Sequence, residues 1–313
     1  MYGLVFLLIF GSASCSHCPV YLTVKNALTL DASRLTINWD KNCENPPEKL
    51  RAFNDNPYLK EAQVFLEISP KAHKLHRFVT NFKLSDLKYP KKWTNHQMNQ
   101  QPQHYHSNCL NFYVLSFNKT NHVTNFECLK INPQWMSETK EIWRFPLKHL
   151  LIPGTKCSAC YMSRSNFKRR NLKRDSFKQN FNVWQQLVFG VRYLEFSVGY
   201  FRSFRGVLNI KGRFFAFSQN QEISSIFSFL EDVKQFVTIS KEIVILDFNH
   251  FAYGFHESTH ELFMDLLQET LEDVAVVNNG TTKSFDLTIE KMKSIGKYLL
   301  ILYNHKDVID STG

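Results

Sequence analysis

Residues 155–160, Thr-Lys-Cys-Ser-Ala-Cys, bring an amine, two hydroxyls and two thiols together. The ammonium group of Lys156 can hold a phosphate or a sulfate. Redox motifs and zinc motifs share the spacing of Cys157 and Cys160. A zinc site would need a second pair of ligands, and a redox pair would lie at the N-terminus of a helix. Neither context is evident, so we expect a disulfide between these two cysteines or separate disulfides to other cysteines.

The elements around this segment should place it at a strand end. The apolar run Leu150–Ile152 precedes Pro153-Gly154, which predicts a buried strand at 149–152 followed by a loop that carries Thr155 to Ser158. In α/β folds, ligands bind at such strand ends.

Three blocks of the sequence carry a resemblance to a known family. They are LLIPGTKCSACY at 150–161, WQQLVFGVRYLEFSVGY at 184–200 and FLEDVKQFVTISKEIVILDFNHF at 229–251. Together they resemble the X-domain of phosphatidylinositol-specific phospholipase C, in the secreted type that has a β-rich domain in front. The resemblance covers about residues 145 to 303 and implies a TIM-like barrel.

The resemblance implies a phosphodiesterase site with two histidines as base and acid, assisted by an arginine and carboxylates. This sequence departs from that pattern. Lys156 stands at the first histidine position and Lys211 at the second, while Cys157 and Ser197 replace an acidic or amide residue and the arginine. Glu195 keeps the carboxylate. A further acidic residue of the family corresponds to Asp247.

These replacements change the chemistry that we expect. An imidazole exchanges protons near neutral pH, whereas a lysine amine, with an ordinary pKa of about 10.4, stays protonated there. We therefore expect an inactive member that binds an anionic phosphate ester or phospholipid head group, without cofactor or metal. The alternative is an active phosphodiesterase in which Lys156 or His250 works with Glu195. Without such a role, we expect His250 to be an exposed loop residue.

The charge of the chain supports an anionic partner. The formal net charge is +10, and the stretch 164–178 holds seven basic residues and one acidic residue. This stretch is either a solvated loop or a contact for an anionic lipid or glycan, and we expect no nucleic-acid partner. Besides Lys156 and Lys211, the candidate anion-binding residues are Arg164, Lys168, Arg169 and Arg170.

The chain should hold two domains after a signal peptide at 1–15. Short alternating strands at 16–142 predict an all-β sandwich, whose binding of another protein is a third functional hypothesis. The second domain should span 143–313. Strands expected at 149–152, 191–198, 207–210, 242–248 and 298–303, alternating with helices expected at 181–189, 221–240, 256–270 and 288–294, predict a parallel α/β sheet. About five strands can be counted there, against eight in a closed barrel, so the sheet is open or the barrel truncated.

The first residues and the cysteines indicate an exported protein. The apolar segment in 1–15 is too short to span a membrane, no later run reaches the required length, and we expect secretion. Six cysteines remain after removal of Cys15, and the expected pairs are Cys109 with Cys128 and Cys18 with Cys43. Asn118 and Asn279 begin glycosylation sequons.

Overall fold

The computed structural model describes residues 18–25, 33–40, 45–58, 62–83, 109–161, 174–201, 214–276 and 284–304. The expected signal segment 1–15 lies outside these residues and stays a prediction. The same holds for the strand expected at 207–210 and for the following candidates: Cys43, Arg164, Lys168, Arg169, Arg170, Lys211 and Asn279.

The described residues form two compact units, each with its own core. The first unit holds the described residues up to 83 together with 109–129, and the second holds those from 130 onward. The division therefore lies before residues 130–142, which the sequence analysis assigned to the front domain. No helix of the described part is long and apolar enough to cross a membrane.

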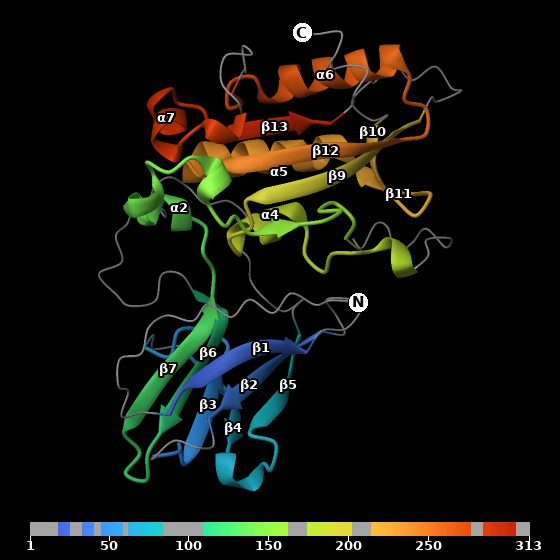
Figure 1. The fold of residues 1–313 in the computed structure, drawn as a ribbon. Helices are drawn as coiled ribbons and strands as arrows, with labels where there is room; N and C mark the ends of the chain where they lie inside the picture. Colours follow the sequence, from blue (N-terminus) through green and yellow to red (C-terminus); the bar gives the residue numbers. More distant parts are fainter. Residues whose placement is uncertain are drawn as a thin grey trace. The chain divides into compact units, whose positions relative to one another are not determined.

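The first unit consists of two antiparallel sheets (Figure 1). The three-stranded sheet has the order β1-β2-β5, and the four-stranded sheet has the order β4-β3-β6-β7. The strands are β1 (Val20–Lys25), β2 (Arg34–Trp39), β3 (Lys49–Phe53), β4 (Val64–Ile68), β5 (Arg77–Lys83), β6 (Cys109–Phe117) and β7 (Val123–Lys130).

Aromatic side chains connect the two sheets of this unit. Phe82 of β5 packs edge-on against the buried Phe112 of β6, with ring centroids 4.9 Å apart. Phe65 of β4 contacts both rings at 5.7 Å. The predicted disulfide between Cys109 and Cys128 is confirmed, and it links β6 to β7. Cys18 is also disulfide-bonded.

The second unit is built on one mixed sheet with the order β11-β10-β9-β12-β13, in which β8 also pairs with β9. The strands are β8 (Gly154–Thr155), β9 (Tyr193–Tyr200), β10 (Phe214–Ser218), β11 (Gln221–Ser225), β12 (Val244–Ala252) and β13 (Leu299–Tyr303). The helices are α2 (Trp135–Glu138), α4 (Val183–Val188), α5 (Ile226–Ser240), α6 (Glu257–Leu271) and α7 (Ile289–Ser294).

The strand directions correct the expectation of a purely parallel sheet. β8, β9, β12 and β13 run parallel, whereas β10 and β11 are antiparallel to their neighbours. β10 and β11 form a hairpin whose turn residues Gln219 and Asn220 both have positive φ. This hairpin explains why residues 221–225, expected as the start of a helix, are a strand: the helical pattern begins at Ile226.

The segment before β8 is the second correction. Residues 149–152 were expected to form a buried strand, but Leu147–His149 is a 3₁₀ turn and Leu151 is 97% exposed. Only Gly154 and Thr155 pair with β9. An apolar run without a neighbouring strand to pair with has no reason to be buried on both faces.

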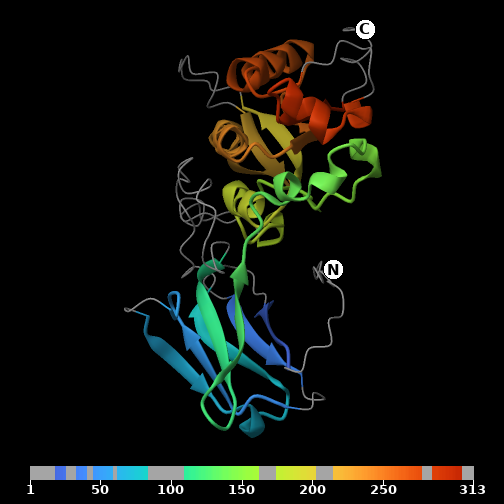
Figure 2. The same ribbon diagram turned by 90° about the vertical axis from the view of Figure 1, so that its left-hand side faces the viewer.

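Helices cover the two faces of the sheet differently (Figure 2). On one face, Phe196 of β9 stacks on Phe229 of α5, and Phe248 of β12 meets Phe263 of α6 edge-on. Among the described residues, the other face is covered at one end, where buried residues from the sheet, α2 and α7 form a cluster: Met136, Leu147, Ile243, Ile245, Ile289, Met292 and Leu300. Polar side chains of β9 and β12 occupy the middle of that face, and Phe217 of β10 lies over Gly199 beside them.

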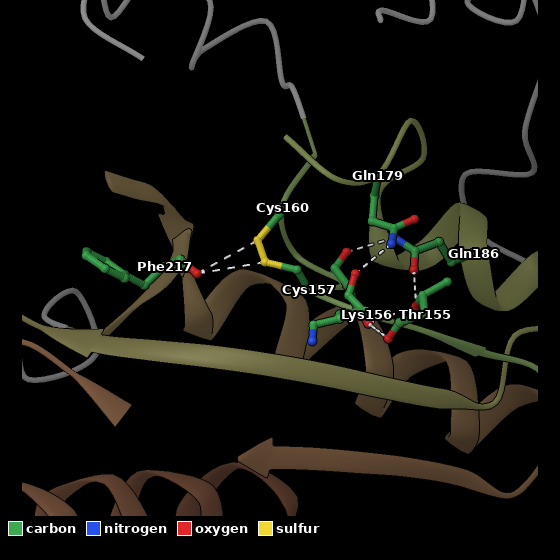
Figure 3. Close-up of a disulfide and its surroundings, with 8 residues drawn as sticks. Thr155, Lys156, Cys157, Cys160, Gln179, Gln186 and Phe217 are labelled. Carbon is green, nitrogen blue, oxygen red and sulfur yellow. Dashed lines mark hydrogen bonds between the residues drawn. A yellow bond between two sulfur atoms is a disulfide. The ribbon is translucent and has the colours of Figure 1, made fainter. Parts of the chain in front are cut away.

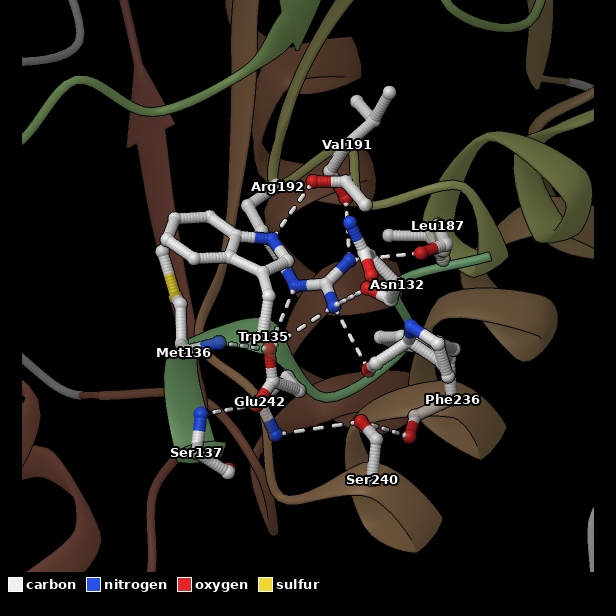
Figure 4. A network of polar contacts seen from close by, with 12 residues as sticks. Asn132, Trp135, Met136, Ser137, Leu187, Val191, Arg192, Phe236, Ser240 and Glu242 are labelled. Atoms are coloured by element: carbon white, nitrogen blue, oxygen red, sulfur yellow. Dashed lines mark hydrogen bonds and ion pairs between the residues drawn. The ribbon is translucent and has the colours of Figure 1, made fainter. Parts of the chain in front are cut away.

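A buried polar network joins α2 and the residues just before it to the sheet of the second unit (Figure 4). The Arg192 guanidinium and the Glu242 carboxylate form a fully buried ion pair. Glu242 accepts hydrogen bonds from the backbone N–H groups of Met136 and Ser137, and Arg192 donates to the carbonyl of Pro133. These contacts are the physical reason why residues 130–142 belong to the second unit.

Candidate functional site

Lys156 lies on the loop that leaves β8, at the carboxyl end of that strand. β8 pairs with Tyr193 and Leu194 at the beginning of β9, so Lys156 follows directly beside β9. Its side chain is exposed, and its carbonyl accepts a hydrogen bond from the side-chain amide of Gln179 at 2.7 Å. The backbone N–H of Ser158 donates to the carbonyl of Glu195 at 2.8 Å. Backbone hydrogen bonds on both sides of Cys157 therefore hold the loop.

The disulfide between Cys157 and Cys160 closes this loop (Figure 3). The sequence left open whether these two cysteines pair with each other or with other cysteines. In the structure they pair with each other. Both sulfur atoms lie near the carbonyl oxygen of Phe217 in β10, at 3.8 and 3.9 Å. Because a disulfide sulfur carries no hydrogen to donate, these are packing contacts. The loop thus contacts β9 through Ser158 and β10 through its disulfide.

Gln186 of α4 fixes the loop from the other side. Its side-chain carbonyl accepts from the Thr155 hydroxyl at 2.7 Å, and its amide donates to the Ser158 carbonyl at 2.8 Å. The Thr155 and Ser158 hydroxyls also lie 2.8 Å apart. Gln186 is buried, so these bonds are shielded from water. The loop around Lys156 is held in one conformation by polar contacts as well as by the disulfide.

Glu195 and Ser197 share the polar face of β9, because alternate residues of a strand point to the same side. The structure therefore brings together Lys156, Glu195 and Ser197, three of the positions that the resemblance singled out. Asp247 of β12 is the register partner of Glu195, so two carboxylates stand side by side on adjacent strands. No ion pair joins Lys156 to Glu195 in the part of the chain that the structure describes.

Asp247 is the most enclosed group of this face and accepts three hydrogen bonds. The Tyr193 hydroxyl donates at 2.6 Å, Asn304 at 2.8 Å and Asn249 at 3.1 Å. Burial, the hydrogen bond to Asp247 and the charge of that carboxylate raise the pKa of the Tyr193 hydroxyl above its ordinary value. The tyrosine therefore keeps its proton and acts as a donor that orients Asp247.

His250 lies on β12 and follows Asn249, a member of this network. It is exposed and is the register partner of Ser197 after a β-bulge that begins at Phe248. Sequence reasoning expected an exposed loop position; the exposure is found, but the residue belongs to a strand. An imidazole is thus present beside the position where the resemblance would have an arginine.

The remaining candidates add little to the site. Lys211 and residues 164–173 of the basic stretch, which include its candidate anion-binding residues, fall outside the described residues. Among the residues that are described, no cluster of three or more His, Cys, Asp or Glu side chains could hold a metal ion.

Comparisons with known proteins give a limited result. No model of a protein family matches the chain, and no curated protein matches its sequence. Among solved structures, the phosphatidylinositol-specific phospholipase C of Listeria monocytogenes is similar, with 20% identity, a TM-score of 0.41, and coverage of 55% of this chain and 57% of that enzyme. The S. aureus enzyme has 16% identity, a TM-score of 0.42, and coverage of 55% and 52%.

The matched region thus spans little more than half the length of these enzymes. A likeness of this degree identifies neither the substrate nor the activity of the chain. The three sequence blocks and the geometry of the polar face are the features of this chain that bear on its function.

Sequence reasoning missed Tyr193, Asn249 and Asn304. A signal for two of them was present, since Asn249 follows Asp247 in the run Asp-Phe-Asn-His and Asn304 follows the strand Leu299–Tyr303. Polar residues at the ends of neighbouring parallel strands meet at the same edge of a sheet. Tyr193 carries no such signal, because a tyrosine in a strand is as expected in a core as in a site.

Proposed function

We propose that the second unit is an inactive phospholipase C X-like domain that binds an anionic phosphate ester or a phospholipid head group without cleaving it. The fold that goes with this proposal is a front β-sandwich followed by an incomplete barrel, in a secreted protein. The single observation that carries it is the exposed Lys156 ammonium on a loop held rigid by a disulfide, beside the polar face of Glu195, Ser197 and Asp247.

The fixed loop supports binding because its backbone loses little conformational freedom when Lys156 meets an anion. An ammonium group is a point charge with three donors, which suits a phosphate. Glu195 and Asp247 do not contribute to anion binding by charge. They can accept hydrogen bonds from hydroxyl groups that a phosphate ester carries beside the phosphate.

The proposed lack of turnover rests on the side chain at position 156. A protonated amine cannot take the proton of a hydroxyl nucleophile, and general-base catalysis needs a group that accepts a proton near the working pH. Lys156 can therefore bind the phosphate but not activate the attacking group.

Binding of the full-length protein to vesicles containing phosphatidylinositol tests the proposal, with phosphatidylcholine vesicles for comparison. We expect binding to fall with salt, and Lys156→Ala to weaken it about tenfold, the effect of losing one charge-assisted hydrogen bond. Lys148→Ala is the matched control, because Lys148 is an exposed cation of the same unit that pairs with Asp286. Equal binding by both variants would contradict the proposal.

His250 supports a second candidate, an active phosphodiesterase. Its imidazole is the register partner of Ser197 and lies on the strand that carries Asp247. Release of inositol phosphate from the same vesicles separates the two candidates. Catalysis would be established if release is lost in His250→Ala and kept in the control His256→Ala, which changes the residue preceding α6. If the wild type releases no inositol phosphate, the binding function remains.

A further inference from the structure

β6 and β7 form a hairpin in the first unit (Figure 1), and backbone hydrogen bonds close the turn between them. The backbone N–H of Asn118 donates to the carbonyl of His122 at 3.0 Å, and that of Asn121 donates to the carbonyl of Asn118 at 3.1 Å. Asn121 has a positive φ of 58°, a conformation that asparagine tolerates better than most residues. Residues 119–122 are exposed, so the turn is open to solvent.

The side chain of Asn118 is held by one of its two polar atoms only. Oδ1 accepts hydrogen bonds from the Thr120 N–H at 3.0 Å, the Thr120 hydroxyl at 2.8 Å and the His122 N–H at 2.9 Å. The side-chain amide nitrogen Nδ2 donates to none of the described residues. A substituent on Nδ2 would therefore break no hydrogen bond of the turn.

We propose that Asn118 is a site of N-glycosylation in the folded, exported protein. The sequence Asn118-Lys119-Thr120 meets the acceptor requirement, and the Thr120 hydroxyl lies against the amide that would be modified. The donor would be a lipid-linked oligosaccharyl diphosphate. Its sugar C1–O bond to phosphate breaks, a C1–N bond to Nδ2 forms, the amide releases one proton, and the lipid diphosphate leaves.

The fold tolerates this modification for two reasons. The hairpin is closed toward its other end by the disulfide between Cys109 and Cys128, so the turn does not have to be rigid for the strands to pair. A glycan is bulky and hydrophilic, and an exposed turn is where it costs least. The proposal concerns the first unit and does not depend on the anion site of the second.

Four forms of the full chain, secreted from eukaryotic cells, test the proposal. Asn118→Asp keeps an oxygen acceptor for the turn but has no amide, and Thr120→Val removes the hydroxyl with little change of shape. Thr120→Ser keeps the acceptor motif. Peptide mapping before and after treatment with peptide N-glycosidase should find the glycan on Asn118 in the wild type and in Thr120→Ser, and its complete loss in the other two.

Thermal unfolding controls for misfolding. The deglycosylated wild type has aspartate at position 118, so it should unfold at the same temperature as Asn118→Asp. If the chain's own leader fails to direct export, a heterologous signal in place of residues 1–15 supplies it. An unmodified Asn118 in secreted wild-type protein would overturn the proposal, including a result in which Asn279 alone carries a glycan.

Discussion

The guanidinium Nη2 of Arg192 lies 3.0 Å from the carboxylate Oε2 of Glu242, and both side chains are fully buried. Burial lowers the pKa of Arg192, and the charge of Glu242 opposes that shift. The pair links the residue before β9 to the chain two residues before β12 and to the N-terminus of α2. The pair holds these elements together in the interior of the second unit and lies apart from the polar face.

Removing one partner of this pair should be strongly destabilising. Glu242→Ala leaves a buried cation and two backbone N–H groups without an acceptor, so we expect a loss of about 3–5 kcal/mol. Asp273→Ala breaks the exposed pair with Lys234 and should cost less than about 1 kcal/mol. Calorimetry measures both, with the transition of the first unit as an internal reference. Equal losses would show that the buried pair is not important for stability.

The two disulfides should differ in their contribution to stability. A disulfide restricts the unfolded chain more when it closes a longer loop. Cys109 and Cys128 are 19 residues apart, and Cys157 and Cys160 are three apart, which corresponds to about 3 and about 2 kcal/mol. Paired Cys→Ser variants, followed by urea unfolding, check the order. A larger loss at 157 and 160 would mean that the loop also stabilises the sheet directly.

Alkaline pH should weaken the second unit through Tyr193. The folded protein raises the pKa of this hydroxyl, whereas in the unfolded chain a tyrosine ionises at about pH 10. The stability that Tyr193 contributes is therefore present below about pH 10 and is lost as the pH rises toward the folded-state pKa. The unfolding free energy of the wild type should fall more steeply above that pH than that of Tyr193→Phe.

Urea unfolding across the alkaline range measures this difference. Tyr253→Phe is the control, because the Tyr253 side chain is largely exposed. If the unfolding free energies of wild type and Tyr193→Phe change in parallel with pH throughout, the hydrogen bond to Asp247 does not raise the pKa of Tyr193 in solution.

Glu195 should oppose anion binding at the proposed site. A carboxylate about 4 Å from an anion costs about 1 kcal/mol in water-like surroundings. We expect Glu195→Gln to bind phosphatidylinositol vesicles about two- to fivefold more tightly. Glu257→Gln, at the start of α6, should leave binding unchanged. Weaker binding by Glu195→Gln would indicate that the carboxylate accepts hydrogen bonds from the ligand instead.

Local patterns predicted those elements that their own residues specify. The helices expected at 256–270 and 288–294 are found as α6 and α7, shifted by one residue at most, because apolar spacing, and in α7 the Thr288 cap, act within the segment. The strand expected at 242–248 is found as β12, which begins at Val244 and continues to Ala252.

By itself, the sequence determined the cysteine pair of the β6–β7 hairpin, the main helices, and the amine at position 156 where the resemblance places an imidazole. Only the tertiary structure decided that Leu151 is exposed, that residues 221–225 pair as a strand, that His250 lies beside Ser197, and that Arg192 and Glu242 meet in the interior. The physical reason is the distance along the chain between the residues that interact. Helix formation and a hairpin depend on near neighbours, whereas strand pairing and buried ion pairs depend on residues distant in the chain, whose positions a local pattern does not contain.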